Sequence, residues 1–580
     1  MRQDHSDIDT VDVLVVGSGA AGMTAAITAA HNGLSVLVIE KAIHWGGSTA
    51  RSGGGVWIPG NTVLRGEAPD DDLEAARTYL TAIIGSVVDK DKIDTYIDHG
   101  PTAFDFLTAH SPLRMRWVPG YSDYYPEAAG GRAHGRSVEP APFDARVLGG
   151  ELATLEPDYS KAPRNFVLTQ ADFRQIHLGL RNPRAPWRAI RIAARWLTAR
   201  IRGQHLLARG QALSAMLRKG MLDAGIPLLL DTPLLELTIT DDRVTGARVR
   251  RGGTEQQITA RSGVILACGG FERNHALRQQ HQRAPISADW TVGAAANTGD
   301  GIAAGAAVGA ATGFMNDAWW GPSIPLPRQP WFCLAERNLP GSLIVNDRGV
   351  RFMNESLPYV DAVHRMYGGD HGQGEGPAEN LPAWLIFDQR YRNRYLFAGL
   401  PPRQPLPQRW FDTGALTRAA TIGELADKIG VPADRLTATV ARFNTFARTG
   451  IDEDFGRGES AYDRYYGDPR QHPNPNLGAV ATGPYYAARL VPGDLGTKGG
   501  LLTDTHSRVL RADHTVIEGL YAAGNTATPV MGHTYAGPGA TIGPAIVFAY
   551  LAAHHIATTA HSAPTTAADQ NNVSRTRNGR

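Results

Sequence analysis

The 580-residue chain has 42% hydrophobic and 20% charged residues and a formal net charge of +2, a composition typical of a globular protein and without the basic excess expected of a nucleic-acid-binding one. Its length favours two or more packed domains, and its two cysteines exclude a disulfide framework and a cysteine metal cluster, so no metal is expected. The polar N-terminus lacks an apolar signal core and no run of about 18 apolar residues occurs, which predicts a cytoplasmic protein that does not span a membrane.

Residues 11–41 combine two apolar runs with a glycine-rich turn. The run Val11–Val16 leads into Gly17, Ser18, Gly19, Ala20, Ala21 and Gly22, then a helix of small residues and a second run that ends at Glu40. In a βαβ dinucleotide unit Gly17 makes the tight turn, Gly19 lets backbone approach a pyrophosphate at the helix N-terminus, and Gly22 lets the helix pack on the strand. Glu40 is placed to accept a hydrogen bond from a ribose hydroxyl. The alternative is an ordinary glycine turn.

A second glycine-rich segment, residues 43–61, follows directly. Gly46, Gly47, Gly53, Gly54 and Gly55 surround the hydroxyls of Ser48, Thr49 and Ser52. Backbone without side chains beside hydroxyl groups suits contact with a flat ring that has polar edges. The alternative is a surface loop.

Residues 70–109 are predicted to be mainly helical from their apolar spacing. The next segment, 117–140, is rich in aromatic residues, glycine and proline and contains Tyr121, Tyr124 and Tyr125. A binding site and simple packing of aromatic side chains are both open interpretations of this segment.

Residues 174–221 contain no acidic residue and eleven basic ones. On a helical wheel Arg188, Arg191, Arg195 and Arg202 cluster, and an apolar stripe lies about a third of a turn away. The stripe consists of Trp187, Ile190, Ala194, Leu197 and Ile201. A helix lying on a membrane surface through residues 183–203, a helix packing its apolar side on the body, and a partner-binding helix are the three interpretations.

The rest of the chain contains two kinds of sequence pattern: strand–glycine–helix segments, and a segment rich in proline and aromatic residues. Residues 226–230 predict a strand, 234–250 a hairpin, 264–271 a strand that runs into glycines, and 297–311 a turn and helix. Residues 319–493 are rich in proline, tryptophan and tyrosine. Within this segment we expect a hairpin that begins at Gly341, followed by an irregular stretch that ends at Tyr359. We also expect a helix over 435–447 and a polar loop over 454–475. Strand, glycine and helix patterns return from Gly496.

This order predicts an α/β protein: a Rossmann-like nucleotide-binding domain with an inserted α+β substrate domain. The expected boundaries are 1–285 for the first part of the nucleotide domain, with a basic insertion near 175–205, then 286–493 for the inserted catalytic domain and 494–557 for the second part. Residues 558–580, rich in Ser, Thr, Asn and Arg, are predicted to be a disordered tail.

The assembled motifs resemble the flavoprotein family of fumarate reductase and succinate dehydrogenase subunits and, within it, the 3-ketosteroid Δ1-dehydrogenases. The family-wide motifs are VVGSGAAG with Glu40, GGSTARSGGG, ILACGGF, NTGDG and LYAAGN. The more specific motifs are SDYYPEAAGG, NESLPYVD, PGDLGTKGG and HTYAGPGATIGPA. The resemblance covers nearly the whole chain except the basic stretch and the tail.

The resemblance implies a dissociable FAD. His44 precedes Gly46 and Gly47, but the neighbouring residues depart from the pattern of covalent flavin attachment. The implied cofactor-binding residues are Gly17, Ser18, Gly19, Ala20, Ala21, Gly22, Glu40, Lys41, Gly47, Ser48, Thr49, Ser52, Gly53, Gly54, Gly55, Leu234, Ala267, Cys268, Gly269, Asn297, Asp300, Gly524, Asn525, Thr541 and Ile542.

By similarity, the chain is expected to remove hydrogens from C1 and C2 of a 3-ketosteroid ring in steroid or sterol degradation. Tyr535 and the Gly539 N–H would bind the C3 oxygen as an oxyanion hole, Tyr359 would take the C2 proton, and FAD would accept the C1 hydride. A free tyrosine has a pKa near 10, so Tyr359 needs a helper. The resemblance supplies a hydroxyl from the SDYYPE segment, and we favour Tyr124 over Tyr121 and Tyr125.

Three alternatives compete with this expectation. They are a steroid dehydrogenase acting at C4–C5, a dicarboxylate reductase of the same fold, and a non-catalytic flavin-bearing binding protein. The expected partners are a hydrophobic 3-ketosteroid, a quinone or other electron acceptor, and a membrane surface on the cytoplasmic face, with no nucleic acid.

Overall fold

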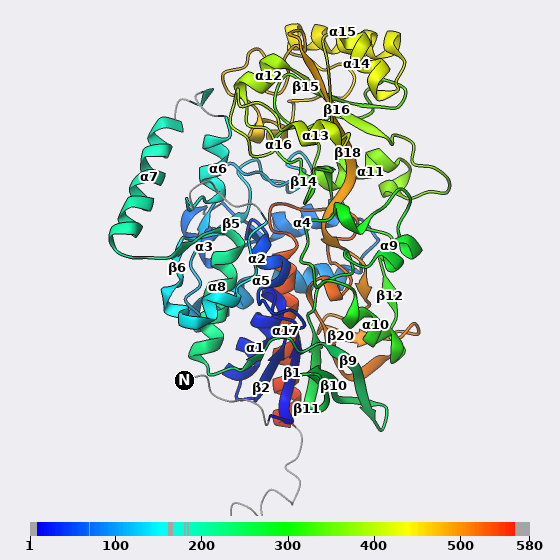
Figure 1. The fold of residues 1–580 in the computed structure, drawn as a ribbon. Coiled ribbons are helices and arrows are strands. Elements are labelled where there is room, and N and C mark those ends of the chain that lie inside the picture. Colours follow the sequence, from blue (N-terminus) through cyan, green and yellow to red (C-terminus); the bar gives the residue numbers. More distant parts are fainter. Residues whose placement is uncertain (1–7, 69, 160–165, 179–180, 183–184, 563–580) are drawn as a thin grey trace, which may run out of the picture.

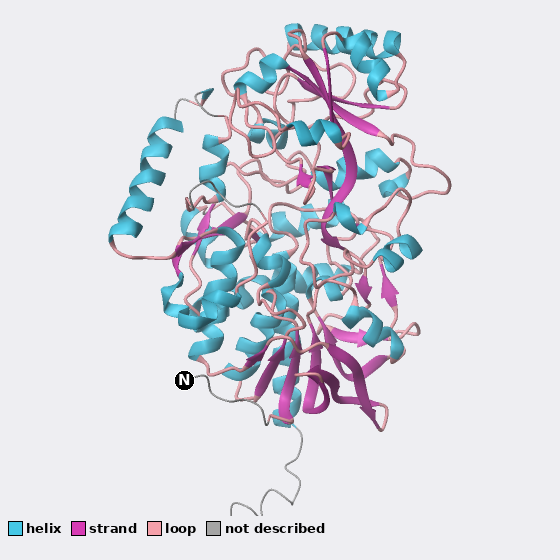
Figure 2. Ribbon diagram, in the orientation of Figure 1, coloured by secondary structure: helices cyan, strands magenta, loops and turns pink. Residues whose placement is uncertain are grey.

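The computed structural model describes residues 8–68, 70–159, 166–178, 181–182 and 185–562 (Figure 1). A large sheet lies at one end of the molecule and a small sheet at the other, with helices between and around them (Figure 2). The helices are α1 (Ala20–His31), α2 (Gly47–Arg51), α3 (Thr62–Glu67), α4 (Leu73–Ile84), α5 (Lys90–His110), α6 (Gln170–Ile176), α7 (Ala185–Ile201), α8 (Arg209–Asp223), α9 (His275–His281), α10 (Asp300–Ala307), α11 (Tyr359–Tyr367), α12 (Gln389–Arg394), α13 (Gln408–Asp412), α14 (Ile422–Ile429), α15 (Ala433–Thr449), α16 (Ala461–Tyr466) and α17 (Ile542–Ser562).

The large sheet has the strand order β20-β21-β10-β11-β1-β2-β8, with β9 paired to β10. Strands β11, β1, β2 and β8 run parallel, and β21 is parallel to β11, whereas β9, β10 and β11 form an antiparallel meander. Its strands are β1 (Thr10–Val16), β2 (Val36–Ile39), β8 (Leu228–Leu229), β9 (Leu234–Thr240), β10 (Arg243–Arg251), β11 (Thr254–Leu266), β20 (Arg508–Leu510) and β21 (Val516–Ala522).

Strand β1 is buried on both faces, as expected of a strand inside a parallel sheet. Val13 and Val15 belong to one hydrophobic cluster, and Leu14 and Val16 belong to the cluster on the opposite face. Helix α1 consists almost entirely of small buried residues, which lets it pack against both the sheet and α17. The predicted βαβ unit and the predicted 234–250 hairpin are therefore confirmed.

The small sheet has the order β14-β13-β18-β16-β15, with β17 paired to β18. Strand β18 is long and reaches back to the large-sheet end, where the Thr497 hydroxyl accepts a hydrogen bond from Phe271 N at 2.9 Å. The strands are β13 (Ala318–Ile324), β14 (Trp331–Phe332), β15 (Ser342–Asn346), β16 (Ala383–Asp388), β17 (Leu416–Ala419) and β18 (Tyr485–Thr497). Minor pairings join β3 (Val56–Trp57), β4 (Met115–Trp117) and β5 (Ser137–Pro140), β6 (Phe143–Asp144) with β7 (Leu206–Leu207), and β12 (Thr312–Gly313) with β19 (Gly500–Leu501).

Three local predictions are wrong. The strand that follows Gly341, β15, pairs with β16 rather than with the residues after its own turn, so no hairpin forms there. The irregular stretch after it does end where Tyr359 begins helix α11. The segment 454–475 contains helix α16, because Ser460 caps its N-terminus and its tyrosines are buried. Residues 558–562 are not a disordered tail but the end of α17; residues 563–580 lie outside the described part of the chain.

Helix α17 is long and apolar enough to cross a membrane by composition, but 61% of its apolar window is buried inside the protein. It packs against α1 and α5, so it serves here as a core helix.

Helix α7 lies at the edge of the molecule beside α6 (Figure 1). Its apolar stripe faces away from the body: Trp187, Ile190, Leu197 and Ile201 are 67%, 59%, 51% and 77% exposed. On its inner side Arg188 Nε and Arg195 Nη2 each lie 2.5 Å from a carboxylate oxygen of Asp172 on α6. The interpretation in which the helix buries this stripe on the body is therefore wrong.

Candidate active site

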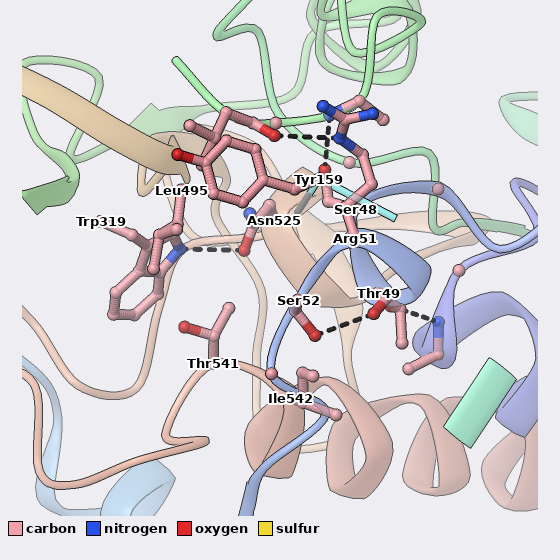
Figure 3. A pocket seen from close by; sticks show the side chains of 18 of the residues that line it. Ser48, Thr49, Arg51, Ser52, Tyr159, Trp319, Leu495, Asn525, Thr541 and Ile542 are labelled. Atoms are coloured by element: carbon pink, nitrogen blue, oxygen red, sulfur yellow. Dashed lines mark hydrogen bonds between the residues drawn. The ribbon is translucent and has the colours of Figure 1, made fainter. Parts of the chain in front are cut away.

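One cavity of about 720 Å³ connects the glycine-rich turns of the large sheet with a cluster of tyrosines. Figure 3 shows part of the lining of this cavity. Except for Gly22, every residue predicted to bind the cofactor lines this cavity, and so do Tyr124, Tyr359, Tyr535 and Gly539. Gly22 has the packing role expected of it, because a Cβ there would lie 1.9 Å from the carbonyl oxygen of Gly17.

The turn between β1 and α1 brings backbone close to the cavity. Gly17 has φ +106°, and a Cβ on it would lie 2.4 Å from the carbonyl oxygen of Ala267 at the end of β11. Gly19 caps α1 without a side-chain hydrogen bond, which leaves the helix N-terminus facing the cavity. Such a terminus attracts phosphate through its N–H groups and the helix dipole.

Acidic groups lie at the two flanks of this turn. Glu40 accepts hydrogen bonds from Ser18 N at 3.0 Å and from the Ser18 hydroxyl at 2.7 Å. Lys41 pairs with Asp300, the first residue of α10, at 2.6 Å. These polar groups suit ribose hydroxyls and phosphates.

The segment 43–61 is held firmly rather than exposed as a loop. The Thr49 hydroxyl accepts from Ala20 N at 3.0 Å, and the Ser48 hydroxyl accepts from Ala294 N at 2.9 Å and from Asn297 Nδ2 at 3.0 Å. Figure 3 shows Thr49 and Ser52 on helix α2 and its end, between the α1 turn and the residues that precede α17. The segment thus forms one wall of the cofactor cavity.

Three tyrosine rings meet at the other end of the cavity. Ring centroids are 5.2 Å apart for Tyr124 and Tyr535, 5.4 Å for Tyr124 and Tyr359, and 5.4 Å for Tyr359 and Tyr535. Tyr359 is the first residue of α11, Tyr124 lies in the loop between β4 and β5, and Tyr535 lies shortly before α17. Distant segments thus bring their hydroxyls into one site.

Neighbouring groups fix the orientation of Tyr535. Its hydroxyl accepts a hydrogen bond from the Thr541 hydroxyl at 3.2 Å, and Trp319 packs edge-on against its ring at a centroid distance of 5.2 Å. Trp319 is itself held by donating a hydrogen bond to Asn525 Oδ1 at 3.0 Å (Figure 3). Burial raises the pKa of Tyr535, and donors that include Thr541 and the Gly539 N–H lower it.

The three SDYYPE-region tyrosines have different partners. Tyr125 donates to Asp361 Oδ1 at 3.1 Å and Tyr121 shares a hydrogen bond with Tyr466 at 2.7 Å. Burial raises the pKa of Tyr359 well above its ordinary value, and a hydrogen bond from Tyr124 lowers it. This arrangement supports Tyr124 as the neighbour of Tyr359.

The sequence analysis missed several residues of the cavity wall. Tyr465 and Tyr466 come from the short helix α16, inside a segment that we had predicted to be a loop. Trp331, Phe332, Leu334, Ala335 and Glu336 follow β13 and carry no motif of their own. His44 lines the cavity. His533, in the motif that also contains Tyr535, does not line it, and its Nδ1 forms a hydrogen bond with Asp317 Oδ2 at 2.8 Å.

Known proteins resemble this chain over nearly its whole length. The family described as FAD binding domain matches residues 12–542. A 3-oxosteroid 1-dehydrogenase of Mycobacterium tuberculosis (strain ATCC 25618 / H37Rv) is 59% identical over 95% of this chain and 99% of that protein. The crystal structure of 3-ketosteroid delta1-dehydrogenase from Sterolibacterium denitrificans in complex with 1,4-androstadiene-3,17-dione has a TM-score of 0.89 and 40% identity, covering 95% of this chain and 100% of that one.

A more distant structure shares the fold. The 3-ketosteroid-delta4-(5alpha)-dehydrogenase from Rhodococcus jostii RHA1 has a TM-score of 0.65 and 22% identity, covering 96% of this chain and 99% of that one.

Proposed function

The chain belongs to the family of FAD-binding 3-oxosteroid 1-dehydrogenases, and from this premise we propose that it converts 3-keto-4-ene steroids into 3-keto-1,4-dienes. It is an FAD-dependent oxidoreductase. The observation that carries the proposal is the meeting of Tyr124, Tyr359 and Tyr535 at one end of a cavity whose other end is the glycine-rich cofactor cradle.

The cradle fits FAD. Gly17 and Gly54 line the cavity and have positive φ, and a Cβ would lie 2.4 Å from the Ala267 carbonyl oxygen at Gly17 and 2.5 Å from the Arg209 carbonyl carbon at Gly54, so neither position accepts a side chain. Backbone N–H groups of the α1 turn would hold the pyrophosphate, Glu40 a ribose, and Ser48, Thr49 and Ser52 the region near the ring. When bound, FAD supplies the hydride acceptor of the reaction.

Tyr535 and Gly539 would act on the substrate ketone. An O–H and an N–H directed at the C3 oxygen stabilise the negative charge that develops there when the C2 proton leaves. The Thr541 hydroxyl donates to Tyr535 at 3.2 Å, so the Tyr535 proton remains available for the ketone.

Tyr359 would accept the C2 proton as the general base. Because burial raises its pKa, the phenolate needs stabilisation, and Tyr124 provides a hydrogen-bond donor to it. Phe332 packs against Tyr359 at 5.2 Å and supplies an apolar wall suited to a steroid ring.

The same geometry argues against a dicarboxylate reductase. Such a site needs cations around both carboxylates of its substrate. Of the arginines that line the cavity, Arg51 pairs with Glu156 at 3.2 Å and Arg209 pairs with Asp158. The third, Arg174, packs on Tyr465 and not on Tyr124, Tyr359 or Tyr535, so it supplies no second cation at the reacting end. The groups around the three tyrosines are aromatic or hydroxyl-bearing.

Turnover distinguishes these functions. The purified holoenzyme is supplied with a dye acceptor and either a 3-keto-4-ene steroid or a saturated 3-ketosteroid, and separately with fumarate and reduced dye. We expect steroid product that has lost two hydrogens and carries a 1,4-diene, with no fumarate reduction. A product desaturated at C4–C5 from a saturated 3-ketosteroid, or fumarate reduction alone, would contradict the proposal.

We also propose that α7 holds the enzyme on the cytoplasmic face of a membrane, where a hydrophobic steroid and a quinone acceptor both partition. The exposed stripe of α7 supports this placement, together with the exposed Arg191, Arg200 and Arg202. Each arginine near anionic lipid contributes about 1 kcal/mol of attraction. Since Arg188 and Arg195 pair with Asp172, fewer arginines are available for lipid than the sequence pattern suggested.

A further inference from the structure

Arg174 differs from the other arginines of the cavity in its partners. It lies on α6 and lines the cavity, yet within the described part of the chain it has no ion pair with a carboxylate. Its Nη1 donates a hydrogen bond to the carbonyl oxygen of Pro119 at 3.4 Å. Arg51 and Arg209, in contrast, each have an acidic partner.

An aromatic ring holds the Arg174 side chain in place. Its guanidinium carbon lies 4.0 Å from the ring centroid of Tyr465. A guanidinium that covers a ring face keeps its N–H groups in the plane parallel to the ring, where they remain available as a two-pronged donor. The residue is thus oriented, partly shielded from solvent and not neutralised by a carboxylate of the described chain.

A row of tyrosines separates Arg174 from the ketone end. Tyr535 contacts Tyr124 at 5.2 Å, Tyr124 contacts Tyr121 at 6.4 Å, and Tyr121 stacks on Tyr465 at 4.2 Å. Arg174 lies beyond Tyr465, at the end of this aromatic wall remote from Tyr535. A steroid whose C3 oxygen is bound by Tyr535 and Gly539 and whose ring system lies along this wall would carry its C17 substituent towards Arg174.

We propose that Arg174 forms a subsite for a carboxylate carried by the C17 side chain of the steroid. The inference rests on the proposed 3-ketosteroid function and names a substrate class within it: 3-ketosteroids with an acidic side chain. A planar guanidinium recognises a carboxylate through two parallel hydrogen bonds. The ligand would supply the negative charge that the described protein residues around Arg174 do not.

The test compares two ligands that differ in the charge of the side-chain end and in one methyl group. One is a 3-keto-1,4-diene steroid with a side-chain carboxylate, and the other is its methyl ester; both are product analogues and so bind the oxidised holoenzyme without turnover. Dissociation constants come from the perturbation of the flavin spectrum. We expect Arg174→Met to weaken carboxylate binding about ten-fold, the value of a charged hydrogen bond, and to leave ester binding unchanged.

Two further variants separate recognition from structure. Arg116→Met removes an exposed arginine of nearby strand β4 that does not line the cavity, and it should change neither dissociation constant. Arg174→Lys keeps the charge but not the planar fork, and it should restore part of the carboxylate affinity. Equal weakening of both ligands by Arg174→Met would show a merely structural role, and unchanged carboxylate binding would also overturn the inference.

The proposed function fails by a different readout. If the wild-type enzyme binds the carboxylate through Arg174 but does not desaturate any neutral 3-keto-4-ene steroid, the reaction assignment is wrong and the subsite stands. If neutral steroids are desaturated and Arg174→Met does not change the ratio of the carboxylate and ester dissociation constants, the proposed subsite is wrong and the reaction assignment stands.

Discussion

Tyr535 is the residue on which the proposed polarisation of the ketone depends. Tyr535→Phe removes the O–H but keeps the ring contacts with Tyr124 and Trp319. Loss of one oxyanion-hole donor typically lowers kcat by about 10² to 10³. We expect that decrease in steady-state turnover with unchanged flavin content. Tyr550→Phe, on the core helix α17, is the matched control and should retain wild-type turnover.

The protonation of Tyr359 predicts the pH dependence of the reaction. Burial holds its pKa well above the ordinary value of 10, so the hydroxyl is protonated at neutral pH and its reactive phenolate is scarce. Below that pKa the phenolate fraction increases about ten-fold per pH unit, so the rate should increase from pH 7 to about 10. Tyr124→Phe removes a group that lowers the pKa, and it should shift the profile to higher pH. A rate that does not change over this range would rule out Tyr359 as the base.

At the scale of one element, the β1–α1 turn tolerates no side chain at Gly17. Gly17→Ala would place a methyl group 2.4 Å from the Ala267 carbonyl oxygen in a left-handed backbone, so we expect purified protein with little flavin. The ratio of flavin to protein absorbance measures this loss. Gly33→Ala also lies at positive φ in the same βαβ unit but has no atom within 4 Å, so it should keep its flavin at a stability cost of about 1 kcal/mol. Full flavin content in Gly17→Ala would contradict the proposed cradle.

Helix α7 gives a second prediction at this scale. Trp187→Asp combined with Leu197→Asp places two charges in the exposed stripe, and cosedimentation with phosphatidylglycerol vesicles should be lost because burying those charges in the interface is costly. Turnover of a dissolved steroid should not change. Ile451→Asp alters an equally exposed apolar residue far along the chain and should leave vesicle binding intact. A wild-type protein that ignores anionic vesicles would refute the membrane proposal.

The whole molecule contains many buried phenols, which affects its stability in alkali. Burial raises the pKa of Tyr79, Tyr96 and Tyr391 as it does in the active site. Above about pH 10 the unfolded chain releases these protons while the folded chain retains them, so the free energy of unfolding falls. We expect the melting temperature to decrease steeply from about pH 10 upward. Buried Lys92, whose pKa is lowered to about 8, has the opposite effect. Between about pH 8 and 10 the folded chain loses this proton before the unfolded chain does, so this group makes the free energy of unfolding increase with pH. A melting temperature that is flat above pH 10 would contradict this account.

Local chemistry explains which parts of the fold could be predicted from sequence. The unit from Thr10 to Ile39 depends on an apolar run, a glycine turn and a small-residue helix, all of which are readable from neighbouring residues. The predicted hairpin at Gly341 assigns strand β15 the wrong partner. Its partner in the sheet, β16, begins at Ala383, and no residue near Gly341 indicates such a long-range contact.

The site shows the same division between local and long-range information. Residues within motifs, such as Tyr535 and Thr541, line the cavity, and the roles assigned to them there stay predictions. Tyr465 and Arg174 were not predicted to belong to it, because their place there depends on how α16 and α6 pack rather than on any spacing in the sequence. The division of the chain at residues 285 and 493 stays a prediction.

The most direct test of the central claim is anaerobic mixing of the purified yellow holoenzyme with a 3-keto-4-ene steroid while the visible flavin absorbance is followed. We predict rapid bleaching with formation of one 1,4-diene per flavin in the wild-type enzyme, and bleaching that is slower by orders of magnitude in Tyr359→Phe and Tyr535→Phe. Persistent yellow colour with several such steroids, or equally fast bleaching in both variants, would contradict the assignment of this tyrosine site to 1,2-dehydrogenation.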